Sequence, residues 1–117
     1  MKSKELEITE AGFRKLALSL PGAVESAHMN HPDFRIGGKI FASLGYPDEG
    51  WGMVKLTPEQ QVLFIERAPG AFQPCAGVWG QRGATNVCLA LAKEKVVMAA
   101  LKNASNNVAS KPKAKKS

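Results

Sequence analysis

Three side chains that could hold a metal ion lie close together in the segment HMNHPDF: His28, His31 and Asp33. Imidazole nitrogens and carboxylate oxygens are common ligands of divalent metals. On an extended strand, however, His28 and His31 point to opposite faces, because successive side chains alternate. Coordination would require a turn between them, which Asn30 and Pro32 could permit. We expect no metal site, and we keep the two histidines as candidate contacts of a partner.

No combination of residue types in the sequence is typical of an active site. The Gly-rich segment GVWGQRG resembles a phosphate-binding loop only faintly, because such a loop follows a strand and opens a helix, whereas a strand is predicted after this one. Cys88 lies in the apolar run NVCLALA and is predicted to be a core side chain. Cys75 follows Pro74 in a loop, with no neighbouring histidine to lower its pKa. We therefore expect no catalytic residue, no cofactor and no enzymatic activity.

Basic side chains near aromatic residues suggest contact with nucleic acid, because cations bind phosphates and aromatic rings stack on bases. Four cations lie on or beside predicted strands and loops: Arg35, Lys39, Lys55 and Arg82. Four more lie in the last seven residues: Lys111, Lys113, Lys115 and Lys116. The formal net charge is +6; without these last four it is +2, from twelve cations and ten acids. DNA is therefore the expected partner, bound weakly and in a salt-sensitive manner.

A protein-interaction or small-ligand-binding domain is the alternative interpretation. Aromatic side chains supply much of the binding energy at interfaces. Trp51, Trp79 and Tyr46 are the candidate contacts for an unknown partner of this kind, together with the two histidines.

The elements that must position these residues can be read from hydrophobic periodicity. Helices are predicted at about residues 9–20, 58–68 and 93–104, and strands at about 24–29, 34–36, 39–44, 51–56 and 84–91. Thr9 and Thr57 are predicted N-caps. Leu63 and Phe64 are expected to point inward from the second helix. The segment 71–83 contains several Gly and Pro residues and is predicted to be a loop.

Gly37 and Gly38 give the clearest turn signal, because a Gly-Gly pair can take the positive φ angles of a two-residue hairpin turn. Such a turn places Ile36 opposite Lys39 and Arg35 opposite Ile40. It also places Phe34 opposite Phe41, and we expect the face that carries this phenylalanine pair to meet the helices.

These elements predict an α+β fold, a two-layer sandwich in which helices pack on one face of an antiparallel sheet. Residues 1–105 are expected to form a single domain and residues 106–117 a disordered Lys-rich tail. The opposite face of the sheet would remain available for function. The first residues contain no apolar run typical of a secretory signal, so a cytoplasmic protein with reduced cysteines is expected. No stretch is apolar enough to span a membrane.

The ordered set of motifs resembles the MmcQ/YjbR family. The segment HMNHPDFRIGGKIFA, from His28 to Ala42, is similar to the family's His, Pro-x-Phe, tight turn and Lys-x-Phe-Ala. The segment VKL around Lys55 and the segment GQRG around Arg82 match two further family segments. The resemblance covers about residues 9–104. It implies a CyaY-like (frataxin-like) fold and a DNA-binding protein with a double-wing motif.

Two departures from related patterns limit what the resemblance implies. Ala84 stands where many relatives have Trp, which removes one candidate stacking group. The acidic ridge by which frataxins bind iron is not reproduced, since Glu5, Glu7 and Glu10 are few and cations follow them. Iron delivery is therefore not expected.

Overall fold

A computed structural model of the chain describes residues 8–28, 30–45 and 48–109. In chain order its elements are α1 (Glu10–Leu18), β1 (Val24–His28), β2 (His31–Ile36), β3 (Lys39–Leu44), β4 (Trp51–Lys55), α2 (Pro58–Arg67), β5 (Phe72–Pro74), α3 (Gly77–Gln81), β6 (Ala84–Cys88), a 3-10 turn η1 (Leu89–Leu91) and α4 (Glu94–Ala109). Tyr46 and the four tail lysines lie outside the described residues.

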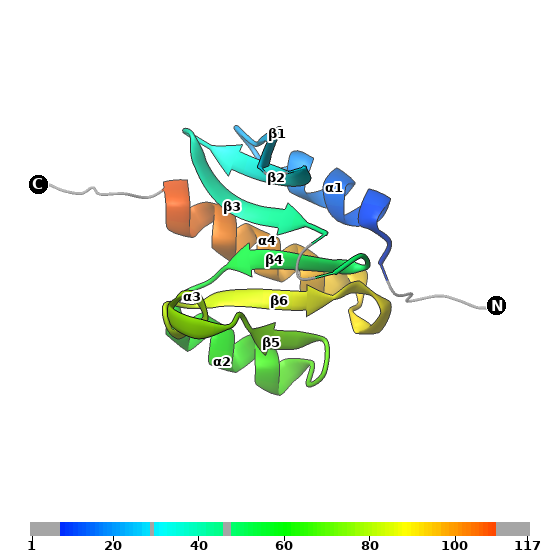
Figure 1. Cartoon of the computed structure of the whole chain (residues 1–117), viewed down its shortest axis with the longest axis vertical. Helices are drawn as coiled ribbons and strands as arrows, with labels where there is room; N and C mark the ends of the chain where they lie inside the picture. The colour runs from blue at the N-terminus through cyan, green and yellow to red at the C-terminus, as the bar shows by residue number, and fades with distance from the viewer. Residues whose placement is uncertain (1–7, 29, 46–47, 110–117) are drawn as a thin grey trace, which may run out of the picture.

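The six strands form one antiparallel sheet in the order β1-β2-β3-β4-β6-β5. Helix α4 packs against β2, β3 and β4, α1 packs against α4, β3 and β4, and α2 packs against β5 and β6. Figure 1 shows the strands in front of these three helices. The predicted α+β sandwich is therefore confirmed. We call the face that carries the helices the covered face and the opposite face the open face.

The helices begin where their N-caps predict. The Thr9 hydroxyl accepts a hydrogen bond from the Gly12 backbone amide at 3.0 Å. At α2, Thr57 and Gln60 cap each other reciprocally, each side chain accepting from the other's backbone amide. These bonds satisfy amides that have no partner within the helix.

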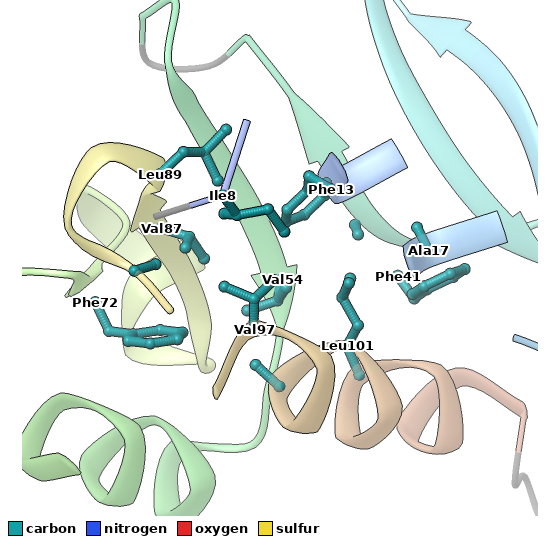
Figure 2. Packing of buried hydrophobic residues seen from close by; sticks show 14 of the residues in the cluster. Ile8, Phe13, Ala17, Phe41, Val54, Phe72, Val87, Leu89, Val97 and Leu101 are labelled. Carbon is teal, nitrogen blue, oxygen red and sulfur yellow. The ribbon is translucent and has the colours of Figure 1, made fainter. Parts of the chain in front are cut away.

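The core lies between the covered face and helices α1 and α4. Phe13 of α1 and Phe34 of β2 are both fully buried, and their ring centroids are 6.1 Å apart. Figure 2 shows Val97 and Leu101 of α4 close beneath Val54 of β4. Burial of these side chains supplies the main driving force for folding.

The β2–β3 hairpin contains a bulge that the sequence prediction missed. Gly37 and Gly38 form the turn with φ angles of 60° and 82°, and the two pairs nearest the turn have the expected register. Beyond them the register shifts, so that Phe34 lies opposite Ala42 instead of Phe41. The bulge lets Phe34, Phe41 and Ala42 all lie buried in the core.

The segment predicted as a loop holds two ordered elements, because β5 pairs with β6 and the turn of helix α3 follows. Glycine permits α3 to pack closely: a Cβ at Gly80 would lie 1.8 Å from the Cys75 carbonyl oxygen. The prediction took these glycines as turn residues only. The close approach of two backbones leaves no periodic signal in the sequence.

Three further predictions were wrong in detail. Leu63 is 62% exposed, whereas Phe64 is buried as predicted and Gln61 is buried with it. Strand β6 ends at Cys88, which is half-buried outside the core cluster. Helix α4 continues to Ala109, so residues 106–109 belong to a helix and not to a tail.

Candidate functional site

A hollow of about 740 Å³ opens on the open face of the sheet. Side chains of β1, β2, β3, β4 and β6 line it, together with residues of α3 and of the segment between β5 and α3. The lining residues are His28, His31, Asp33, Ile40, Ser43, Met53, Lys55, Cys75, Ala76, Trp79, Ala84 and Asn86. Its exposed surface is largely apolar, with a few polar groups, as is typical of ligand sites.

Lys55 and Trp79 stand together at one end of the hollow. The Lys55 ammonium lies 5.7 Å from the centroid of the Trp79 ring, within the range of a cation–π contact. Lys55 is half-buried, whereas Trp79 is 62% exposed. A cation and an accessible aromatic ring are therefore presented side by side, one from a strand and the other from helix α3.

A buried glutamine holds α3 in place. The Gln61 side-chain amide is 3.1 Å from each of three acceptors: the carbonyl oxygens of Gly80 and Ala84, and the Thr85 hydroxyl. Thr85 in turn donates to the Gly83 carbonyl at 2.7 Å. This network joins α2, α3 and β6, and so fixes the helix that carries Trp79.

The lining of the hollow contains a carboxylate, that of Asp33, which is ion-paired with Arg35. Asp33 is only 2% exposed, and Arg35 donates two hydrogen bonds to it, Nε to Oδ1 at 2.8 Å and Nη2 to Oδ2 at 3.1 Å. The hydrogen bond to Asp33 raises the pKa of Arg35, against an opposing effect of desolvation. This guanidinium therefore already binds a carboxylate of the same chain, and the contact of Arg35 with a phosphate stays a prediction.

His28 and His31 occupy the other end of the hollow. They are directly opposed in the β1–β2 pair, and so share one face of the sheet. A continuous extended strand would have placed them on opposite faces; the antiparallel pairing of β1 with β2 matches the alternative that the sequence analysis left open. No group of three or more His, Cys, Asp or Glu suited to a metal ion occurs among residues 8–28, 30–45 and 48–109.

The four cations outside the tail that were predicted to contact nucleic acid are scattered. Lys55 lines the hollow and Arg35 is paired beside it, but Lys39 is exposed at the hairpin end opposite Ile36, on the other side of its strand. Arg82 is exposed at the C-terminal end of α3, outside the lining. Trp51 is half-buried opposite Cys88 and is likewise outside it.

Cys75 is a lining residue that the sequence suggested only as an inert thiol. Its Sγ lies 3.1 Å from the Asn86 Oδ1, to which the thiol donates. Burial raises the pKa of Cys75 above its ordinary value. Burial therefore favours the neutral form of this thiol.

Comparison with known proteins decides the family. A family model described as YjbR matches residues 18–105. The chain belongs to the YjbR family. The match includes every residue that lines the hollow.

The fold of this YjbR-family chain also occurs in a solved structure. The crystal structure of the Deinococcus radiodurans protein DR2400, which has a DUF419 domain, matches with a TM-score of 0.74 and 16% sequence identity. The match covers 90% of this chain and 81% of that chain. At this identity the likeness shows the fold alone. No curated protein matched the sequence. None of the described helices has the length and apolar character that crossing a bilayer requires.

Proposed function

We propose that this YjbR-family chain is a non-catalytic DNA-binding protein that holds DNA on the open face of its sheet. Lys55 would contact a phosphate and Trp79 would stack on a base. The observation that carries the proposal is the pairing of the Lys55 ammonium with the exposed Trp79 ring at the edge of the hollow.

The charges around the hollow support an anionic ligand. The Asp33 carboxylate is neutralised by Arg35, which leaves the Lys55 ammonium as the charge without an ion pair among the described lining residues. The chain as a whole has a formal net charge of +6. The paired Asp33 carboxylate and the Lys55 ammonium together favour a phosphate over a cationic ligand.

The absence of catalysis is part of the proposal. Cys75 is a nucleophile-type side chain in the lining, and its neighbour is the Asn86 amide, which cannot accept a thiol proton as a base does. The raised pKa of Cys75 also keeps its thiolate fraction low.

The test is fluorescence anisotropy with a labelled DNA oligonucleotide, using the full chain, as salt rises from about 50 to about 200 mM. Lys55→Gln should weaken binding and lower the slope of log K against log salt by roughly 0.7 to 0.9, the effect of one lost phosphate contact. Lys39→Gln removes the same charge outside the hollow and is the matched control. Equal effects of the two variants, or complete loss of binding on deleting residues 111–117, would contradict a site on the open face.

A small-ligand site is the second candidate, because the exposed surface of the hollow is largely apolar. It predicts that a small aromatic anion raises the thermal midpoint of the chain and that Trp79→Ala abolishes the rise. Such a result without salt-dependent DNA binding would favour this candidate over the first.

A further inference from the structure

We infer that the nucleic acid held on the open face is single-stranded, and that it crosses the strands from Trp79 toward His28 and His31. The inference rests on the proposed DNA binding and names the form of DNA that the site takes. Three features of the described residues carry it: the shape of the face, the placement of its cations and the position of its rings.

The shape of the face excludes a duplex from the hollow. Bases in a duplex are stacked inside it, and proteins read their edges with a helix or ribbon that protrudes into a groove. Here the surface is concave, and its depth is lined by side chains of β2, β3, β4 and β6. A single strand can turn its unstacked bases into such a hollow.

The cations also fit a single strand better than a duplex. A protein that inserts no helix or ribbon into a groove binds a duplex through its phosphates. Such binding requires several cations on one surface of the protein. Lys39 and Arg82 lie outside the hollow, and Arg35 is held by Asp33. Lys55 remains, and one cation beside one ring matches the repeating unit of a single strand, a phosphate next to a base.

Aromatic rings at both ends of the hollow define the path of the bound single strand. Trp79 marks one end, and the imidazoles of His28 on edge strand β1 and His31 on β2 mark the other. Strands β1 and β6 are separated by four strand spacings, which is about 19 Å. Tryptophan and histidine rings both stack on bases. Between them, Ser43 and Asn86 supply polar groups over a floor that includes Ile40 and Met53.

The experiment compares one labelled DNA strand with its own duplex, using the full chain. We expect the single strand to bind more tightly, and Trp79→Ala to weaken it by roughly 5- to 140-fold, the range given by the loss of one stacked base. Val78→Ala truncates a neighbouring exposed side chain of α3 and should leave affinity unchanged. Circular dichroism of each variant checks that the fold is retained.

A length series then tests the path. Affinity for oligothymidylates should rise with length until the strand reaches from Trp79 to the histidines and then level off, within the roughly 4 to 16 nucleotides that small β domains cover. His28→Ala should shorten the length at which affinity levels off, whereas Lys39→Gln should not.

The outcomes separate this inference from the proposal beneath it. Tighter binding of the duplex, with loss of that binding in Lys55→Gln, would overturn the single-strand inference and leave DNA binding on the open face intact. Binding of neither form would overturn both. Equal losses from Trp79→Ala and Val78→Ala would also overturn the inference, because no base would then stack on Trp79.

Discussion

The covered and open faces of the sheet are made from different kinds of residue. On the covered face, Phe34 and Val54 are fully buried among other apolar side chains. On the open face, the same two strands present Asp33, Met53 and Lys55 to a hollow. Adjacent residues of one strand thus serve opposite purposes, because side chains alternate between faces. Stability should depend mainly on the first face and binding mainly on the second.

The largest expected effect is on stability and comes from the covered face. Phe34→Ala removes a fully buried ring that packs on Phe13, and should lower the free energy of unfolding by about 3 to 5 kcal/mol. Met53→Ala truncates a partly buried side chain on the open face and should cost only about 1 kcal/mol. Urea denaturation followed by circular dichroism measures both. Similar costs would mean that the open face is packed as firmly as the covered face.

A smaller effect should link the two faces through Gln61. Gln61→Met keeps a side chain of similar length and removes the amide donor to Gly80, Ala84 and Thr85. Leaving buried acceptors without this donor should cost about 1 to 3 kcal/mol of unfolding free energy. DNA binding should weaken as well, since α3 carries Trp79.

The matched control for that variant is Val62→Ala, an exposed neighbour on α2, which should change stability by less than about 0.5 kcal/mol. Loss of stability in Gln61→Met with unchanged affinity for DNA would show that the network supports the fold without positioning Trp79.

The covered face could be predicted from the sequence because its apolar side chains recur with the period of a helix or a strand. Phe13 and Ala17 recur at helical spacing and are buried, and so are Val97 and Leu101 of α4. The Gly-Gly turn was also predicted, since its positive φ angles suit glycine in particular. The prediction contained every strand of the sheet except β5, which has only three residues and therefore shows no alternating pattern.

The open face could not be predicted to the same extent, because it depends on contacts between distant segments. Starting β2 at His31 instead of Phe34 reverses the relative positions of His28 and His31. The pairing of Arg35 with Asp33 was not predicted, although both residues are visible in the sequence. Trp79 and Lys55 were each selected as candidates, but 24 positions separate them and no spacing rule joins them.

The smallest expected effect is on the reaction rate of the Cys75 thiol. This rate reports whether solvent reaches the hollow in the absence of DNA. Burial raises the pKa of Cys75 above 9.0, so at pH 8 its thiolate fraction is below that of an ordinary cysteine. In a Cys88→Ser background, reaction with a disulfide reagent should therefore be slower than for a free thiol. Bound DNA should slow it further, because Cys75 lines the hollow.

The same shift fixes the direction of a pH effect on stability. Because the folded chain keeps the Cys75 proton to a higher pH than the unfolded chain, the unfolded state loses its proton first as pH rises past 9.0. The contribution of Cys75 to stability is therefore complete below pH 9.0 and declines above it, and Cys75→Ser should remove this part of the decline in urea titrations. A Cys75 thiol that reacts as fast as a free cysteine, and equally fast with DNA bound, would place it outside the binding surface. The open face would then be divided, with its ligand confined to the side that carries Met53 and the histidines.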